Sequence, residues 1–502
     1  MRAKVIVALT FLSFSVLSSG QAGTQKLLYT FTGGEDGGQP YQAGVIFDQA
    51  GNLYGVTEYG GAYNKGTVYQ LTPSPSGPWT ENVLYSFTGG TDGARPQGGL
   101  AIDGAGNLYG TTSDGGVPNV YCGTVFSLSP SESGWTFTIL HTFTGGKDGC
   151  SPQADVMYSG LVYGTAAGDG CSGNGTLFWM TTSGGGYRAN CFEGTTGWYP
   201  GGMCGCAVGL CGTSYFGGTQ QSGNIWQQGM SGSYLPASLH SFSEKGKVGW
   251  APVGDLTSQD NEWAASGNVY GTTSLGGTGG GGAVYLLAEE LTRRGWVWTI
   301  SALHDFPASP EDGSSPWAGV ALDAEGNVYG TTLGGPDAGG TVFKLTPGAK
   351  NNWTESVLYS FTGGSDGGVP TSGVVLDTAG NLYGTTSSGG IYDQGVVYEV
   401  TPPTATTTTL TSSPNPSTHG QAVTFTAVVA SGTGVSPNGA TVSFMKGAKV
   451  LGTGSLTSGS ASFTTAKLPV GTDSITATYG GDSNFGGSTS NPVAQVVENP
   501  AD

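Results

Sequence analysis

A motif of seven residues, Gly-Asn-Leu-Tyr-Gly-Thr-Thr, recurs along the 502-residue chain and limits its fold more than any other feature. Five clear copies begin at Gly51, Gly106, Gly267, Gly326 and Gly380. Two degraded copies occupy residues 161–165 and 209–213. The copies are spaced by roughly 50 to 60 residues, a period typical of propellers and solenoids. We therefore expect a repeat architecture.

Each repeat contains four short segments that alternate in polarity or are rich in β-branched and aromatic residues, as expected of strands. One segment ends in Phe, a second is followed by an Asp-x-x-Gly-Asn turn, the third contains the Tyr of the motif, and the fourth begins with Gly. In the first repeat these are residues 27–31, 44–48, 51–57 and 66–69. The 93 glycines recur at fixed offsets from these segments, which indicates ordered turns rather than disorder.

Seven units of four antiparallel strands predict an all-β fold, a seven-bladed β-propeller followed by a small immunoglobulin-like sandwich. The strand order supports ring closure. The chain starts on an outermost-type strand, residues 27–31, and its array ends with only three strands, residues 373–401. The first strand would therefore complete the last blade.

The predicted domain boundaries follow shifts in composition. Residues 1–23 are expected to form a signal peptide, because a basic start at Arg2 and Lys4 precedes an apolar run and small residues. The propeller is expected over 24–402, a Thr/Pro linker over 403–410, and an immunoglobulin-like domain with alternating strands over 411–498. No later segment has the apolar length of a transmembrane helix.

A formal net charge of −18 argues against nucleic acid as a partner, because phosphate contacts need cationic side chains. Because the N-terminal segment is expected to be a signal peptide, the expected location is secreted or at the cell surface. The expected partner is an extracellular ligand, either a carbohydrate or another surface protein. We expect no cofactor.

Seven cysteines are confined to one region of the chain. In an exported protein they are expected to form disulfides, with three bridges and one free thiol among many arrangements that the sequence alone leaves open. A zinc site at Cys204, Cys206 and Cys211 is the competing interpretation, but its spacing fits common zinc sites poorly. The cysteines are Cys122, Cys150, Cys171, Cys191, Cys204, Cys206 and Cys211.

The repeated Asn-Leu-Tyr-Gly-Thr-Thr-x-x-Gly-Gly and Gly-Thr-Val-Phe-x-Leu-Thr-Pro segments resemble the GloVer tandem repeat over about residues 27–402. That resemblance implies an exported bacterial protein of a family with varied surface anchors. Residues 405–497, with the segment Tyr-Gly-Gly-Asp-Ser-Asn-Phe at 479–485, are similar to bacterial Ig-like repeat domains. Those domains imply an adhesive or spacer role. Neither resemblance brings a catalytic residue with it.

Candidate ligand-face residues come from two features. The loop Phe-Thr-Gly-Gly-x-Asp-Gly recurs between repeats and would supply carboxylates to calcium or to a sugar; the alternative is a simple Asp-Gly turn. The irregular third and fourth repeats add aromatic residues suited to sugar stacking. The candidates are Asp36, Asp92, Asp148, Asp366, Trp198 and Tyr199. The three histidines His141, His240 and His304 occupy outermost strands of separate repeats, so we expect them to lie far apart.

The sequence favours a non-enzymatic binding or adhesion protein, because no recognisable catalytic motif is present. The ligand site is expected near the axis, on the face with the longer loops, toward the third to fifth repeats. The alternative is an extracellular carbohydrate-active enzyme, a hydrolase or lyase, using the same face. Two acidic residues across an axial pocket would favour the enzyme, whereas a Gly-lined tunnel without them would favour binding. A structural envelope component is the second alternative.

Overall fold

The computed structural model describes residues 23–74, 78–168, 173–206, 209–229, 236–259, 267–292, 295–309, 312–349 and 352–500. All named elements are β-strands. They belong to two compact units. The first unit is Gly23–Pro402, and the strands of the second unit follow from Pro403 onward. The predicted signal peptide, residues 1–23, lies outside the described residues except for Gly23. In the described part of the chain, no helix is long and apolar enough to cross a membrane.

The first unit contains seven four-stranded antiparallel sheets formed by the described residues. Sheet 1 contains β2 (Ile46–Phe47), β3 (Leu53–Thr57), β4 (Thr67–Thr72) and β5 (Thr80–Ser86). Sheet 2 contains β6 (Ala101–Ile102), β7 (Leu108–Thr112), β8 (Thr124–Ser131) and β9 (Gly134–Thr142). Sheet 3 contains β10 (Met157–Tyr158), β11 (Val162–Ala166), β12 (Thr176–Met180) and β13 (Arg188–Cys191).

The other four sheets follow in chain order. Sheet 4 contains β14 (Trp198–Cys206), β15 (Gly209–Phe216), β16 (Asn224–Gly229) and β17 (Ala237–Ser241). Sheet 5 contains β18 (Thr257–Ser258), β19 (Val269–Thr273), β20 (Gly280–Thr292) and β21 (Gly295–Pro307). Sheet 6 contains β22 (Ala321–Leu322), β23 (Val328–Thr332), β24 (Thr341–Pro347) and β25 (Trp353–Ser360). Sheet 7 contains β26 (Val375–Leu376), β27 (Leu382–Thr386), β28 (Val396–Thr401) and β1 (Thr24–Thr30).

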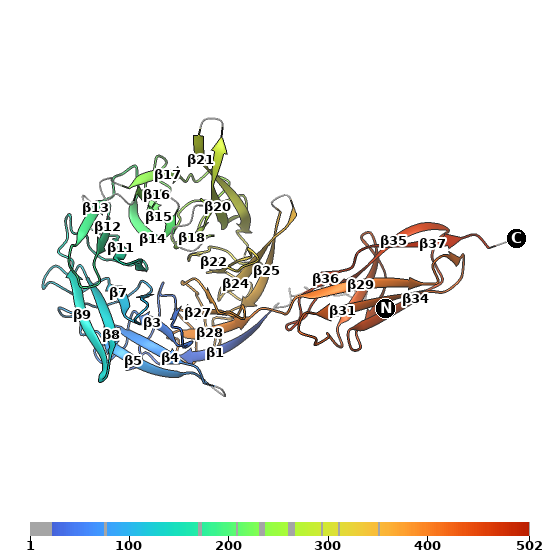
Figure 1. The fold of residues 1–502 in the computed structure, drawn as a ribbon, viewed down its shortest axis with the longest axis horizontal. Helices are drawn as coiled ribbons and strands as arrows, with labels where there is room; N and C mark the ends of the chain where they lie inside the picture. The colour runs from blue at the N-terminus through green and yellow to red at the C-terminus, as the bar shows by residue number, and fades with distance from the viewer. Residues whose placement is uncertain are drawn as a thin grey trace, which may run out of the picture. The chain divides into compact units, whose positions relative to one another are not determined.

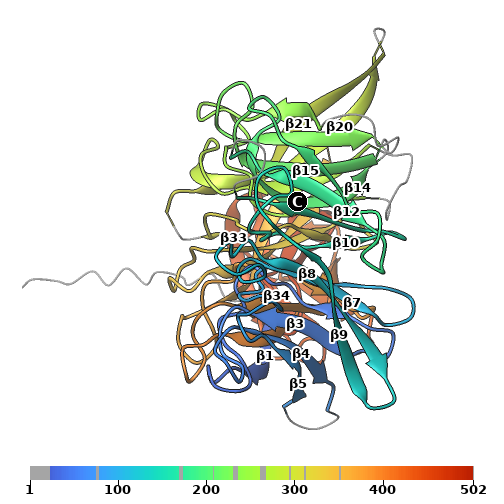
Figure 2. The same ribbon diagram turned by 90° about the vertical axis from the view of Figure 1, so that its left-hand side faces the viewer.

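The sheets are arranged as a propeller-like ring, with the first strand of each sheet toward the centre and the fourth at the outside (Figure 1). The chain ends of this ring meet in sheet 7, where β1 pairs antiparallel with β28 from Thr24 opposite Thr401 to Thr30 opposite Val396. The hairpin of β20 and β21, each 13 residues long, projects beyond the other strands in both Figure 1 and Figure 2. An N-terminal strand thus completes a sheet made of the last three strands of the array.

The repeated motif begins in the turn between the first and second strands of a sheet. In sheet 1 the Asp48 carboxylate accepts hydrogen bonds from Asn52 N (2.9 Å), Asn52 Nδ2 (2.7 Å) and Tyr54 Oη (3.0 Å). Burial acts to raise the pKa of Asp48, but these hydrogen bonds outweigh it and the pKa is lowered. The same contacts recur at Asp103, Asp323 and Asp377. Asp, Asn and Tyr of the repeat therefore form one hydrogen-bonded turn.

The second glycine of the motif leaves room for an aromatic ring on the neighbouring strand. A Cβ atom on Gly55 would lie 2.4 Å from Tyr69 Oη, and one on Gly164 would lie 2.2 Å from Phe178 Cζ. These rings are completely buried. A side chain at the glycine would therefore force the ring out of the core.

The first threonine of the motif joins neighbouring sheets. Its hydroxyl donates a hydrogen bond of 2.8–3.2 Å to a main-chain carbonyl of the next sheet. That carbonyl lies just before the first strand of the next sheet, except in sheet 4, where it lies within β14. Because such a bond satisfies a buried hydroxyl and a buried carbonyl together, it fixes the register between sheets. The pairs are Thr165 with Gly201, Thr213 with Gly254, Thr272 with Ala318, Thr331 with Ser372, and Thr385 with Ala43.

The cysteines form disulfides, as expected. Cys122 is bonded to Cys150, and Cys206 is bonded to Cys211 across the β14–β15 hairpin. Cys191 is also disulfide-bonded. Cys204 is a free thiol. The remaining cysteine, Cys171, lies outside the described residues.

The second unit contains a three-stranded sheet and a larger sheet. The first has the order β29 (Thr406–Ser413), β31 (Val423–Ser431), β34 (Ser460–Thr465). The second has the order β30 (Ser417–Thr418), β37 (Val493–Glu498), β35 (Gly471–Tyr479), β32 (Thr441–Lys446), β33 (Lys449–Ser455), with β36 (Ser488–Thr489) paired to β35.

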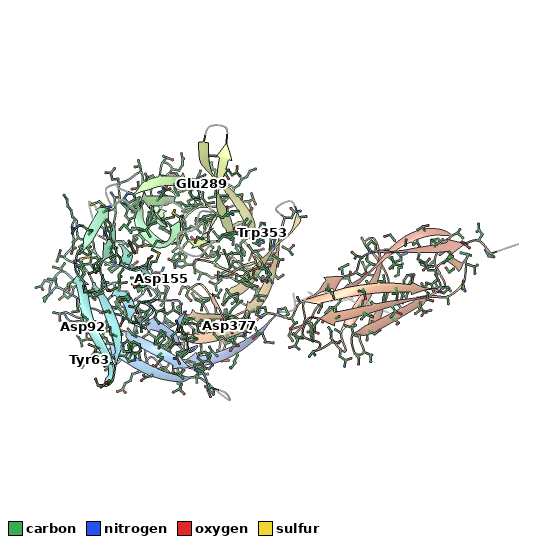
Figure 3. The ribbon with its side chains drawn as sticks, in the orientation of Figure 1. Tyr63, Asp92, Asp155, Glu289, Trp353 and Asp377 are labelled. Atoms are coloured by element: carbon green, nitrogen blue, oxygen red, sulfur yellow. A yellow bond between two sulfur atoms is a disulfide. The ribbon has the colours of Figure 1, made fainter. Side chains whose placement is uncertain are left out.

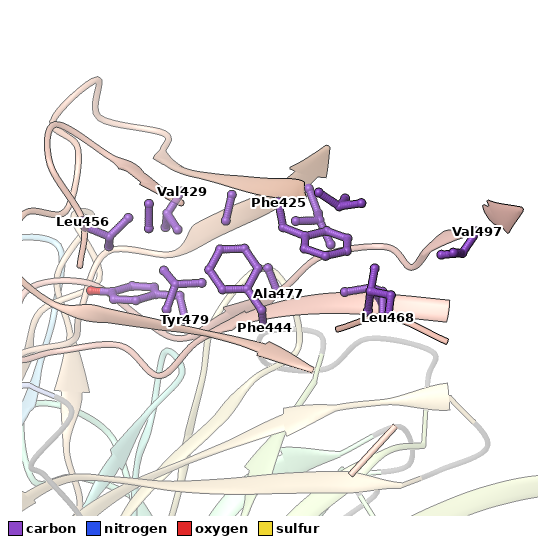
Figure 4. Close-up of a cluster of buried hydrophobic side chains, with 14 residues drawn as sticks. Phe425, Val429, Phe444, Leu456, Leu468, Ala477, Tyr479 and Val497 are labelled. Atoms are coloured by element: carbon purple, nitrogen blue, oxygen red, sulfur yellow. The ribbon is translucent and has the colours of Figure 1, made fainter. Parts of the chain in front are cut away.

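Buried side chains of both sheets form one core in the second unit, including Phe425, Phe444 and Tyr479 (Figure 4). Strand β29 begins inside the range 403–410 that was expected to be a linker, because Thr406 pairs with Ser431 at the end of β31.

Candidate functional site

The candidate site lies where the chain enters the first strand of each sheet. In five sheets the site residue is the one that directly follows, in the sequence, the residue whose carbonyl accepts the threonine hydroxyl. In sheets 2 and 3 the equivalent residue stands two places before the first strand, as Gly44 does before β2. We call these seven residues the inner ring. Its members are Gly44, Gly99, Asp155, Gly202, Asp255, Gly319 and Gly373.

Glycine is needed in the inner ring for space rather than for backbone conformation, since none of its five glycines has a left-handed φ. A Cβ atom on Gly202 would lie only 1.3 Å from Asp255 Oδ1. A Cβ atom on Gly99 would lie 2.8 Å from Asp155 Oδ2. At Gly44, in contrast, a Cβ atom would have no neighbour within 4 Å. The two aspartates therefore occupy the space left by glycines of the preceding sheets.

Asp155 and Asp255 are hydrogen-bonded to each other although they come from sheets 3 and 5. The Gly99 amide donates to Asp155 Oδ1, and the Met203 amide donates to Asp255. Burial raises the pKa of both carboxyls, and the charge of Asp155 raises that of Asp255 further, well above its ordinary range. Since two carboxylates in contact cannot both ionise easily, the pair favours holding one proton between them.

This acid pair, Asp155 and Asp255, lies at the wall of a pocket of about 480 Å³. Figure 3 places Asp155 near the middle of the ring of sheets. All seven sheets contribute to the lining, mostly through the segment before their first strand. The described lining residues include no Lys, Arg or His. The aromatic and amide side chains of the lining are Tyr41, Tyr199, Tyr215, Phe216, Trp317, Gln42, Gln97 and Gln153.

Hydrogen bonds hold two of the amide side chains in place. Tyr199 Oη donates to Gln153 Oε1 at 2.9 Å, and Gln97 Nε2 donates to Glu58 Oε1 at 2.9 Å. Glu58 is buried and forms an ion pair with Arg95. The Gln153 amide group therefore keeps its N–H donors for other partners, and Gln97 keeps its carbonyl.

Trp317 also lines the pocket. Its Nε1 is buried and has no hydrogen-bond partner among the described residues. Buried indole N–H groups usually find a partner, so this one is an unsatisfied donor within the pocket wall. Within the described residues, no group of three or more His, Cys, Asp or Glu side chains could hold a metal ion.

The four loop aspartates that the sequence singled out each cap their own turn. Asp36 accepts hydrogen bonds from Thr32 N at 2.8 Å and from Tyr29 Oη at 3.0 Å. Asp92 and Asp366 repeat this arrangement, and at Asp148 the tyrosine is replaced by His141, whose Nε2 lies 2.9 Å from Oδ1. None of the four is among the described residues that line the pocket, and Asp92 lies near the outer edge of the ring in Figure 3.

The two aromatic candidates differ in position. Tyr199 lines the pocket. Trp198, the preceding residue on β14, is not among the described lining residues and stacks on Phe216 with ring centroids 4.7 Å apart. Tyr199 has a left-handed φ of 60°, so β14 departs from a regular strand where it passes the pocket.

The acid pair and Trp317 were not predicted from the sequence. A signal for the pair does exist. When the repeats are aligned on their first strands, five of them carry Gly at the inner ring and two carry Asp. No comparable signal marks Trp317. It directly precedes Ala318, whose carbonyl accepts the threonine hydroxyl, and the residue at that position differs among the five repeats with this bond.

Comparison with protein families gives two matches. The family model described as the Gloeobacter/Verrucomicrobia repeat matches residues 13–226 and 209–442. The model described as a bacterial Ig-like domain (group 3) matches residues 410–498. No curated protein matches the chain.

Solved structures give only distant likenesses. A protein of Bacteroides uniformis described as a candidate 6-phosphogluconolactonase is 15% identical, covers 68% of this chain and 89% of its own, and has a TM-score of 0.44. The extracellular domain of a candidate one-component system of B. thetaiotaomicron is 9% identical over 92% of this chain and 56% of its own, with a TM-score of 0.43. A gluconolactonase of Xanthomonas campestris is 12% identical over 78% and 93%, with a TM-score of 0.37. Values this low assign no activity to the chain.

Proposed function

Because the chain belongs to the Gloeobacter/Verrucomicrobia repeat family, we propose that its seven sheets are the blades of one β-propeller whose axial pocket binds a small polyhydroxylated ligand outside the cell. The second unit is proposed to be an immunoglobulin-like sandwich that serves as a spacer or attachment module. Its match to the bacterial Ig-like family and its two-sheet core support this assignment.

Export from the cytoplasm is supported by the disulfides, since such bonds persist in oxidising compartments and are rare in the cytosol. The predicted signal peptide over residues 1–23 agrees with this proposal. The proposed domain limits are 24–402 for the propeller and 411–498 for the immunoglobulin-like domain.

The composition of the pocket carries the ligand assignment. Five aromatic side chains supply apolar faces, and three glutamines supply donors and acceptors, two of them held by hydrogen bonds. Ligand pockets generally combine apolar walls with a few oriented polar groups, and sugars match such walls because they have apolar ring faces and hydroxyl rims. A volume of about 480 Å³ is enough for a small saccharide.

Non-enzymatic binding is proposed ahead of glycoside hydrolysis because of how the two carboxyl groups meet. Glycosidases place their carboxyl groups about 5–5.5 Å or about 6.5–9.5 Å apart, so that a sugar bond or a water fits between them. Asp155 and Asp255 instead hydrogen-bond directly. One observation does favour a second candidate function. A carboxyl pair that shares a proton can act as general acid and general base, so hydrolysis by such a pair is the alternative.

The test is a glycan array followed by calorimetry with the full chain. Tyr199→Ala and Trp317→Ala are expected to weaken binding of any array ligand by at least about 10-fold, since stacking and hydrogen bonds at a buried site contribute a few kcal/mol. Tyr63→Ala is the matched control, because Tyr63 is 59% exposed and is not among the described lining residues. Absence of saccharide binding, or equal loss in the control, would refute the proposal. Release of products from bound ligands would favour the hydrolase alternative.

A further inference from the structure

We propose that the ligand carries a protonated amino group, as an amino sugar does, and that this ammonium is held between the carboxyl groups of Asp155 and Asp255. The inference rests on the proposed function, because it names the chemical class of ligand for the same pocket. Three features of the pocket support it: its charge, its aromatic walls and the proton that the acid pair holds.

The charge of the pocket favours a cation. The acid pair is its source of formal negative charge, and no described lining residue is Lys, Arg or His. The nearby Arg95 is already engaged by Glu58 and by the ring of Tyr59, 5.4 Å from the ring centroid. No positive side chain of the lining would offset the repulsion between an anionic ligand and the acid pair. An ammonium would be attracted to the pair, because charges in such a site are poorly screened.

The aromatic walls act in the same direction. The faces of Trp and Tyr rings attract cations placed within about 6 Å of the ring centroid, and several rings around one site form the cages that bind organic ammonium groups. Here the rings come from opposite parts of the ring of sheets: Tyr41 before sheet 1, Tyr199 and Tyr215 in sheet 4, and Trp317 before sheet 6. A neutral sugar would use the same walls but would leave the charge of the acid pair uncompensated.

The proton balance makes this proposal specific. Without a ligand the acid pair favours holding one proton between its two carboxyl groups. An ammonium between the two groups donates N–H bonds to both, so both carboxylates are ionised and the proton of the pair leaves to solvent. Affinity for an amine therefore rises with pH until the amine itself loses its charge. A neutral ligand that accepts from the Asp255 O–H would show the opposite slope.

Other titratable groups face the acid pair. The Cys204 thiol interacts with Asp255, and burial raises its pKa to about 12. Burial also raises the pKa of the Tyr41 phenol. The remaining groups at the pocket are the phenols of Tyr199 and Tyr215, and Glu58 outside its lining is paired with Arg95. The acid pair is thus the group whose protonation the test follows between pH 5 and 7.5.

The test is isothermal titration of the full chain with a glucosamine trimer and, as the matched neutral probe, an N-acetylglucosamine trimer. Titrations at several pH values between 5 and 7.5, in two buffers of different ionisation enthalpy, report the protons released. The amine is expected to bind about 10- to 100-fold more tightly, because it adds charge-assisted hydrogen bonds worth about 1.5–3 kcal/mol. It is expected to release up to one proton per site.

Two variants assign the effect. Asp155→Asn and Asp255→Asn should each abolish the preference for the amine and the proton release. Glu35→Gln is the control, since it removes the same charge from an exposed loop residue. Equal or tighter binding of the acetylated trimer, or affinity for the amine that falls with pH while the amine is still protonated, would overturn the inference and leave saccharide binding intact. Binding of neither trimer would overturn both. If an Asn variant fails to fold, the wild-type pH slope and proton count still decide.

Discussion

The inner ring can be tested by the same substitution at two of its glycines, because the expected effects on stability differ. Gly44→Ala and Gly202→Ala change equivalent positions in sheets 1 and 4. A methyl group on Gly44 enters open space, whereas one on Gly202 would lie 1.3 Å from Asp255 Oδ1. Neither glycine has a left-handed φ, so backbone strain does not separate the two variants.

The magnitude follows from the contacts. Overpacking costs about 1–3 kcal/mol. Displacing Asp255 also breaks its hydrogen bond to Asp155, at about 1–3 kcal/mol for buried polar groups. Gly202→Ala should therefore lower the free energy of unfolding by about 2–6 kcal/mol. With an unfolding entropy of about 2.1 cal/mol/K per residue over the Gly23–Pro402 unit, that corresponds to a melting temperature lower by about 2–7 °C. Gly44→Ala should be neutral or stabilising by up to about 1 kcal/mol.

The assay is a thermal melt of the full chain followed by tryptophan fluorescence. A double variant, Gly202→Ala with Asp255→Gly, removes the carboxylate that the new methyl group would contact, and it should recover most of the loss. If Gly202→Ala and Gly44→Ala melted within about 1 °C of each other, or if the double variant melted no higher than Gly202→Ala, the packing argument for the inner ring would be wrong.

Three further outcomes are expected. Thr385→Val removes a hydroxyl that bonds to the next sheet and should cost about 0.5–1.5 kcal/mol in a melt, whereas Thr111→Val should cost nothing, since the Thr111 hydroxyl is buried with no partner among the described residues. Cys122→Ser opens a bridge with a sequence separation of 28 and should destabilise by about 3–4 kcal/mol relative to the oxidised wild type. Folding raises the pKa of Asp255, so the folded chain binds a proton that the unfolded chain releases above about pH 4. The free energy of unfolding therefore decreases as the pH rises above about 4. Asp255→Asn should therefore gain stability relative to wild type as the pH rises above about 4, and parallel pH profiles would contradict this.

The strand pattern was predictable because each repeat uses the same local chemistry. Asp48, Asn52 and Tyr54 form a turn from residues close in sequence, and Gly55 marks the strand that faces an aromatic ring. The innermost strands are shorter than expected. Residues 44–48 were predicted as a strand, but only Ile46–Phe47 pair, because the chain at Gly44 is still part of the inner ring.

The candidate site was less predictable because it depends on contacts between repeats. Asp155 and Asp255 are 100 positions apart in the sequence, and nothing in their spacing shows that their side chains meet. The loop aspartates such as Asp92 were easier to notice, since they recur, yet recurrence here reflects a shared turn. Disulfide pairing had a similar limitation, because Cys122 in the β7–β8 loop meets Cys150 in the connection from sheet 2 to sheet 3.

The pairing of β28 with β1 also determines how the first unit resists tension. Strand β28 ends at Thr401, and the second unit starts at Pro403, so a pull on the second unit reaches the first through β28. That strand is not at an edge: it is hydrogen-bonded to β27 on one side and to β1 on the other. Extraction of β28 would have to break two ladders at once instead of one. A protein held at a surface by its C-terminal part would thus be loaded along the joint that keeps the ring shut.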